Sequence, residues 1–310
     1  MSLAGQRVAV CGAGGFIGAA VCRIGAGLGA EIVAIGPGSA AGARTISFPD
    51  RIESEAGLVP KLQGVSVLIH AAGRGTPVGI GAMHDALALH ELRLTAIVLE
   101  AACRANVGRV VLVSSGGTVY GEPAGDALIT EDHALWPRSR YGAVKLLAEE
   151  MARTVDRMGL VACVVARLSN PYGPGQVNRR GQGLVATVAA RAQTEGPVEI
   201  WGDGSTVRDY LYIDDAARGL LAAAGLAGGM AANVSSGAGL RTHDVVIDVL
   251  AAFRAANPVQ FLMGRDAGVA TNVLCNARLR STGWTPEVSW REGLAKTAAW
   301  WAQGRPVIFP

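Results

Sequence analysis

Tyr141 and Lys145 are the residues whose types and spacing point most directly to chemistry. They stand four residues apart in "RSRYGAVKLLAEEMAR", so they share one face of the helix that this segment predicts. A phenol has a pKa of about 10 and is a poor base at neutral pH. A neighbouring ammonium favours the phenolate, which can then remove a proton from a hydroxyl. The alternative is a surface pair on an ordinary amphipathic helix, where this spacing is common.

A second group of polar residues follows a predicted strand in "RVVLVSSGGTVYGEP". The apolar run Val110–Val113 ends in Ser-Ser-Gly-Gly-Thr, which brings the hydroxyls of Ser115 and Thr118 to one strand end. These hydroxyls either contact a ligand or satisfy backbone groups at the end of the strand.

A glycine-rich turn stands at the start of the chain, in "VAVCGAGGFIGAAV". Gly-x-x-Gly-x-x-Gly directly after a strand and opening a helix allows a tight turn and a close approach of backbone to a pyrophosphate. The start of the helix then offers free N–H groups to the phosphates, so the turn predicts a dinucleotide site rather than a turn without ligand. The cofactor-binding residues predicted here are Gly12, Gly15, Phe16, Ile17 and Gly18.

The second strand lacks the acid that usually follows in such a site. An Asp or Glu at its end binds the hydroxyls of the adenosine ribose, but here the strand ends at Gly36 and Pro37. The usual barrier to a 2′-phosphate is therefore absent. Ser39 and Arg44 lie nearby in sequence and could accept one, although Arg44 could equally be a surface charge. The residues alone leave NAD and NADP open.

Short β-branched strands alternate with helices through the first two-thirds of the chain. This alternation predicts an α/β fold with a doubly wound parallel sheet of the Rossmann type, covered by helices on both faces. The expected strands are Arg7–Cys11, Glu31–Ile35, Ser66–His70, Arg109–Val113 and Ala162–Ala166, and the expected helices are Phe16–Leu28, Ala86–Ala105 and Tyr141–Met158.

The alternation of strands and helices ends near Asn170, where the Gly-, Pro- and Asn-rich segment "NPYGPGQVNRRGQG" predicts a long loop. We therefore expect an NAD-binding Rossmann domain over residues 1–170 and a smaller, mainly substrate-binding α/β domain over 171–310. Part of 207–250 is expected to pack back on the first domain. The elements expected here are a helix near Leu184–Thr194, a strand near Val198–Trp201 and a helix near Asp214–Ala224.

Composition excludes several classes of function. The 310 residues carry a net charge of +3 with scattered basic residues, so no nucleic-acid partner is expected. No apolar span is long enough for a membrane helix, and the start of the chain does not read as a signal peptide. The five cysteines form no close pair, which favours reduced thiols in the cytoplasm and no metal site.

Taken together, the motifs resemble the extended short-chain dehydrogenase/reductase family, in its NAD-dependent epimerase/dehydratase branch, and UDP-glucose/UDP-galactose 4-epimerases in particular. The segments that carry the resemblance stand in family order along nearly the whole chain. They are "GAGGFIG", "VLIHAAG", "VLVSSGGTVYGE", "YGAVK", "RLSNPYGPGQ", "WGDGSTVRDYLYIDDAA" and "STGWTP".

The resemblance implies roles for individual residues. Tyr141 is the catalytic base, and Lys145 holds the nicotinamide ribose and tunes the tyrosine. Further cofactor contacts are His70, Ala71 and Ala72, and substrate contacts are Asn170, Arg208 and Arg265. The resemblance also implies a nucleotide-diphosphate sugar as substrate and a homodimer formed by the helices at 86–105 and 141–158.

The chain departs from the family pattern at the strand end. The serine that helps bind the sugar O4 is replaced by Gly116, so Thr118 is expected to take its place, with Ser115 as the second choice. Glu91 stands where an Asn is common, and the Asp that usually follows near Arg265 is missing.

The expected reaction is epimerisation at C4 of the sugar through transient oxidation by tightly bound NAD. A 4,6-dehydratase would need an acid/base pair, and Gly117 and Thr118 stand where such relatives carry Asp-Glu. A decarboxylase or an NADP-dependent reductase stays open. A non-catalytic dinucleotide-binding scaffold or sensor is the alternative of another class, and a tuned tyrosine argues against it.

Overall fold

The computed structural model describes residues 3–39, 41–73, 85–123, 125, 127–177, 183–263 and 269–304. Its centre is a seven-stranded sheet in which every pair of neighbours is parallel, in the order β10-β6-β5-β4-β1-β2-β3. The strands are β1 (Arg7–Cys11), β2 (Glu31–Ile35), β3 (Thr45–Phe48), β4 (Val67–His70), β5 (Arg109–Ser115), β6 (Ala162–Leu168) and β10 (Ala231–Val234). The expected doubly wound α/β fold is confirmed.

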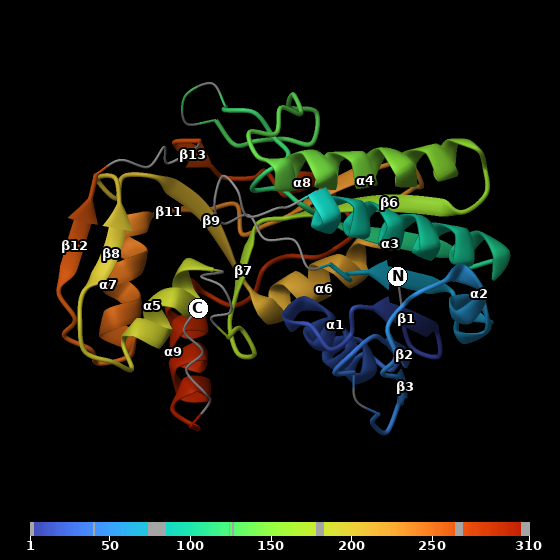
Figure 1. Cartoon of the computed structure of the whole chain (residues 1–310), viewed down its shortest axis with the longest axis horizontal. Helices are drawn as coiled ribbons and strands as arrows, with labels where there is room; N and C mark the ends of the chain where they lie inside the picture. The colour runs from blue at the N-terminus through green and yellow to red at the C-terminus, as the bar shows by residue number, and fades with distance from the viewer. Residues whose placement is uncertain are drawn as a thin grey trace.

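Helices cover both faces of this sheet (Figure 1). They are α1 (Phe16–Gly27) and α6 (Ile213–Ala223) on one face, and α2 (Glu55–Leu58), the short 3₁₀ helix Val59–Leu62, α3 (Asp85–Arg104) and α4 (Arg140–Arg157) on the other. Alternate strand residues enter different cores: Val8 and Val10 pack toward α1, and Ala9 and Cys11 pack toward α3. Burial on both faces is why these strands have continuous apolar sequences.

Two strands of the sheet were not expected from sequence. β3 is an edge strand whose side chains are only partly buried, so it lacks a continuous apolar run. β10 is reached only after the chain has left the sheet and returned through α6. β5 also runs to Ser115, two residues further than its apolar run ends.

The remaining elements form a smaller body to one side of the sheet (Figure 1). Its strand β9 (Val207–Tyr212) pairs with β7 (Asn170–Tyr172), β11 (Gly239–Arg241) and β13 (Thr271–Asn272), and β8 (Val198–Trp201) pairs with β12 (Val259–Leu262). Its helices are α5 (Leu184–Arg191), α7 (Thr242–Ala252) and α9 (Trp290–Trp301), whereas α8 (Ala277–Arg280) packs on β10 and α6 at the large sheet. The domain boundary at 170 and 171 stays a prediction.

Within the described ranges no helix has the length and apolar character needed to cross a membrane. The five cysteines are free thiols.

Candidate active site

The glycine-rich turn between β1 and α1 is shaped for close backbone approach. Gly12 has φ +90°, and a Cβ there would lie 2.6 Å from the backbone nitrogen of Ala72. A Cβ on Gly18 would collide with the Gly12 carbonyl oxygen. Helix α1 begins at Phe16 without a side-chain cap and without an acid in its first turn, so its N–H groups stay available for an anion. The turn therefore fits the pyrophosphate of a dinucleotide.

A groove of about 650 Å³ opens beside this turn. Four of the predicted cofactor residues line it: Gly12, Gly15, Ala71 and Ala72. Its other lining residues are Gly14, Gly36, Pro37, Arg51, Ile52, Glu53, Gly73, His90, Arg93, Leu94 and Ile97. Phe16, Ile17 and Gly18 form the first turn of α1 next to it, and His70 ends β4 directly before Ala71.

Of the two residues suggested for a 2′-phosphate, Arg44 lies in the wrong place. Its carbonyl accepts from Ile32 at the start of β2, and its guanidinium reaches the Gly29 carbonyl, whereas the ribose end of the groove is at Gly36 at the other end of the strand. The chain folds back between β2 and β3, so Arg44 is near Gly36 in sequence but lies at the opposite end of β2 in space. Ser39 stays near Gly36, and its hydroxyl pairs with that of Ser47 at 2.8 Å.

Tyr141 and Lys145 lie in the first turns of α4. Ser139 caps this helix, because its hydroxyl accepts the Gly142 N–H at 3.1 Å. Lys145 Nζ lies 5.7 Å from the centre of the Tyr141 ring. Gly142 lets the helix approach the strand-end loop closely, since a Cβ there would collide with the Thr118 carbonyl oxygen. The helix turn that carries Tyr141 thus packs against the Thr118 backbone.

His70 is a buried residue at the end of β4, directly before Ala71 of the groove. Burial, with a further contribution from the charge of Lys145, lowers the pKa of His70 to about 3, so the ring is neutral at physiological pH. Its Nε2 lies 3.4 Å from Thr95 Oγ1, and its Nδ1 has no hydrogen-bond partner among the described residues. The end of β4 is therefore within electrostatic reach of Lys145.

The structure separates the hydroxyls of the Ser-Ser-Gly-Gly-Thr segment. Ser114 donates to the buried carboxylate of Glu149 at 2.6 Å, so its role is internal. Thr118 Oγ1 is buried and has no hydrogen-bond partner in the described part of the chain. A Cβ on Gly116 would meet Leu274 Cδ1, the end of a flexible side chain, so the serine of the family pattern would require this leucine to shift.

Two of the predicted substrate contacts, Asn170 and Arg208, lie on strands near the Gly116–Gly117 loop. Asn170 donates to the Asp209 carbonyl at 2.8 Å, and its Oδ1 is 3.9 Å from where a Cβ on Gly117 would stand. Arg208 lies on β9 and donates to the carbonyls of Val207 and Ala270. Burial lowers the pKa of Arg208. Arg265 lies outside the described residues.

Asn272 is a polar residue that the sequence did not single out. It pairs with Arg208 in the β13–β9 register and donates to the Gly116 carbonyl at 3.2 Å. Its Oδ1 is buried without a partner among the described residues. It therefore joins the strand-end loop to the strand that carries Arg208.

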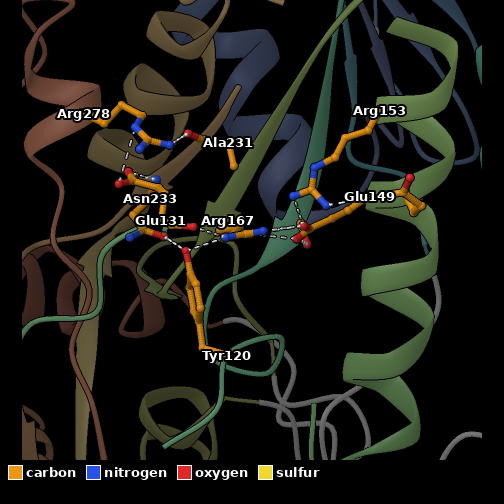
Figure 2. A network of polar contacts seen from close by, with 10 residues as sticks. Tyr120, Glu131, Glu149, Arg153, Arg167, Ala231, Asn233 and Arg278 are labelled. Carbon is orange, nitrogen blue, oxygen red and sulfur yellow. Dashed lines mark hydrogen bonds and ion pairs between the residues drawn. The ribbon is translucent and has the colours of Figure 1, made fainter. Parts of the chain in front are cut away.

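A buried ionic network holds α4 against the sheet and was also missed from sequence. Figure 2 shows Arg167 of β6 between Glu149 of α4 and Tyr120. Arg167 donates to both oxygens of Glu149 and, at 2.9 Å, to the Tyr120 hydroxyl. Tyr120 donates in turn to Asn233 of β10 at 2.7 Å. Glu149 is completely buried, and it lies two turns along α4 from Tyr141.

The comparisons with known proteins identify the family of the chain. A profile described as "NAD dependent epimerase/dehydratase family" matches residues 8–234. A UDP-glucose 4-epimerase of Mycolicibacterium smegmatis is 34% identical over 205 residues. That match covers 66% of this chain and 65% of the relative, so the chain aligns with less than two thirds of the relative's length.

Solved structures match over almost the whole chain. The UDP-glucose 4-epimerase of Thermus thermophilus in complex with NAD has a TM-score of 0.87 at 26% identity, covering 97% of this chain and 100% of that one. The dTDP-glucose 4,6-dehydratase DesIV of Streptomyces venezuelae, with NAD and TYD bound, also has a TM-score of 0.87 at 26% identity, covering 97% and 98%.

The glycine turn and the groove fit the NAD cofactor that the resemblance implied, and the family description names the same cofactor. Profile, relatives and structural neighbours agree on one assignment. The chain belongs to the NAD-dependent epimerase/dehydratase family.

Proposed function

We propose that the protein is a nucleotide-sugar epimerase that inverts C4 of the sugar in a nucleotide-diphosphate hexose. The observation that carries the proposal is that Tyr141 and Lys145 share a helix face on α4, whose Gly142 packs closely against the backbone of Thr118, a residue with a buried and unpartnered hydroxyl in the described structure. UDP-glucose 4-epimerases among the relatives and structural neighbours support the same reaction.

Each residue of this group has a task in the reaction. Tyr141 Oη accepts the proton of the sugar 4-hydroxyl, and the Lys145 ammonium favours the phenolate that this step needs. Thr118 Oγ1 donates a hydrogen bond to the same sugar oxygen, which gives its buried hydroxyl a partner. The glycine turn and the groove would hold NAD, which would supply a reversible acceptor for the hydride of C4, and Tyr141 would give its proton back to the sugar oxygen when that hydride returns.

The smaller body of the protein binds the diphosphate of the substrate in this proposal. Asn170 and Arg208 lie on the strands that face the Gly116–Gly117 loop. A guanidinium binds phosphate oxygens in a bidentate manner, which suits Arg208 for the diphosphate. Arg265 stays a prediction for the same group.

Dehydration is the nearest competing reaction, since a 4,6-dehydratase is among the structural neighbours. Elimination of water across C5 and C6 needs an acid/base pair. Gly117 and Thr118 occupy the positions where the resemblance expects that pair, and neither carries a carboxylate. This difference favours epimerisation.

The test is incubation of the purified protein with UDP-glucose or UDP-galactose, with and without added NAD, and separation of the sugars by chromatography. Interconversion without net consumption of NAD supports epimerisation. A 4-keto-6-deoxy product would mean dehydration, and net oxidation of NADPH in the presence of a 4-keto sugar would mean reduction. Normal NAD binding with no reaction on any nucleotide sugar would contradict the epimerase proposal and favour a non-catalytic dinucleotide-binding scaffold.

Replacement of Tyr141 by Phe tests the base directly. We expect Tyr141→Phe to lower the rate by about a thousandfold, because it removes the group that accepts the 4-hydroxyl proton. The content of bound NAD and the circular dichroism spectrum serve as controls and should not change. Turnover close to that of the wild type would exclude Tyr141 as the base.

We also propose that the protein acts as a homodimer in the cytoplasm. The free thiols fit a reducing compartment, and α3 and α4 expose leucines that a second copy could cover.

A further inference from the structure

We propose that Arg51 binds a phosphate on the adenosine ribose, so that the groove accepts NADP as well as NAD. Arg51 lies in the loop after β3 and lines the same groove as Gly12, Gly36 and Pro37. The proposal needs only the dinucleotide groove and does not depend on which reaction the protein catalyses.

The first observation is that the end of β2 cannot carry the usual acid. Gly36 has φ +121°, a conformation that side-chain-bearing residues rarely adopt. It opens a tight turn in which Ser39 N–H donates to the Gly36 carbonyl at 3.1 Å, with Pro37 second and Gly38 at φ +79° third, as in a type II turn. The missing acid is thus a consequence of the backbone conformation.

This turn also packs against the glycine loop. A Cβ on Gly14 would collide with the Pro37 carbonyl oxygen. The two loops therefore hold each other at the mouth of the groove, and no carboxylate at this strand end opposes a 2′-phosphate. In dinucleotide sites of this fold, an acid at this place selects the free ribose hydroxyl, whereas a nearby arginine accommodates the phosphate.

The second observation is the position of Arg51. The Gly36 N–H donates to the Phe48 carbonyl at 2.9 Å, so the end of β3 lies beside the end of β2, and Arg51 follows three residues later. Its neighbour Asp50 pairs with Lys61 at 3.6 Å. Arg51 itself is exposed and makes no hydrogen bond or ion pair with any residue that the structure describes.

The chemistry of a guanidinium suits this place. It stays charged at all physiological pH values and binds phosphate oxygens through two parallel N–H groups. The same plane can stack on an adenine, a role that would serve NAD and NADP equally. Glu53 also lines the groove and could instead bind the ribose hydroxyls. These two alternatives make different predictions.

The experiment is a fluorescence titration of the full-length protein with NADPH and with NADH, for the wild type and for Arg51→Gln. We expect the two dissociation constants of the wild type to lie within about tenfold of each other. Arg51→Gln should weaken NADPH binding about tenfold or more and change NADH binding by less than about threefold. Arg44→Gln, an exposed arginine at the other end of β2, is the matched control and should change neither.

Three results would overturn the proposal. NADPH could bind more than about a hundredfold more weakly than NADH to the wild type. Arg51→Gln could weaken both nucleotides equally, which would mean stacking on adenine. Glu53→Gln could weaken NADH alone, which would mean that Glu53 reads the ribose hydroxyls. Because all these readouts are binding constants, failure of the sugar assay would leave the inference standing.

Discussion

At the scale of single residues, the strand-end hydroxyls differ in what they contact rather than in their chemistry. Ser114 is committed to Glu149, whereas Thr118 Oγ1 is buried without a protein partner in the described structure. A buried hydroxyl without a partner is unfavourable unless a ligand supplies one. We therefore propose that the Thr118 hydroxyl binds a ligand rather than stabilising the folded protein.

Thr118→Val tests this distinction, because it removes the hydroxyl and keeps the shape of the side chain. We expect the free energy of unfolding to stay within about 0.5 kcal/mol or to rise, since no protein hydrogen bond is lost. We expect kcat for the sugar to fall by about tenfold to a hundredfold. Stability is measured by urea unfolding and kcat by the interconversion assay.

Ser115→Ala is the matched control for that variant and should leave kcat near the wild-type value. The reverse pattern, with loss in Ser115→Ala and none in Thr118→Val, would transfer the role to Ser115. Position 116 has no hydroxyl, and Leu274 Cδ1 lies where a side chain on Gly116 would begin.

At the scale of elements, helix α4 carries both the candidate base and its own anchor. Tyr141, Lys145 and Glu149 follow one another at intervals of four residues along one helix face. Glu149 accepts from Ser114 of β5 and Arg167 of β6, which join the helix to the sheet, and also from Arg153 of α4 itself. This anchor on two strands fixes α4 against the sheet.

Glu149→Gln tests the anchor. The substitution leaves the guanidinium of Arg167, which is 1% exposed, without a buried counter-charge. Breaking a buried ion pair in this way costs about 3–5 kcal/mol of the free energy of unfolding, as measured by urea denaturation. Arg153→Gln removes a partner that is partly exposed, and it should cost about 1 kcal/mol or less. Equal costs for the two variants would mean that Arg167 does not need Glu149.

At the scale of the whole molecule, the neighbouring helices α3 and α4 each expose a leucine. Leu89 on α3 is 68% exposed and Leu147 on α4 is 53% exposed, and the two helices lie side by side (Figure 1). Large exposed apolar side chains on neighbouring helices are typical of surfaces that a partner covers.

We therefore expect the protein to have twice its chain mass of 31.8 kDa in light scattering. Leu147→Glu should shift it to the monomer, because a charge buried in an apolar interface is strongly unfavourable. Leu160→Glu is the control, since Leu160 is equally exposed but lies beyond the end of α4. A monomeric wild type, or a dimer that survives Leu147→Glu, would exclude this interface.

The sequence by itself determined the features that depend on local patterns. The β1–α1 glycine turn and the α4 helix were predicted to within a residue or two, because strand and helix periodicity and turn glycines act over a few neighbours. The edge strand β3 and the strand β10 were not predicted, because their pairing in the sheet depends on segments that are distant in sequence. The missing acid at Gly36 was visible in sequence, but Arg51 beside it was not.

Only the tertiary structure decided which side chains are free to act. Glu149 and Glu150 are adjacent acids in sequence, yet Glu149 is buried against Arg167 and Glu150 is exposed. Gly116 is contacted by Asn272, which is 156 residues away along the chain. A hydrogen bond or a collision depends on distance in space, and the chain brings these residues together only when the sheet closes. The sequence therefore supplies the chemical groups, and the fold decides which of them have no protein partner and can bind a ligand.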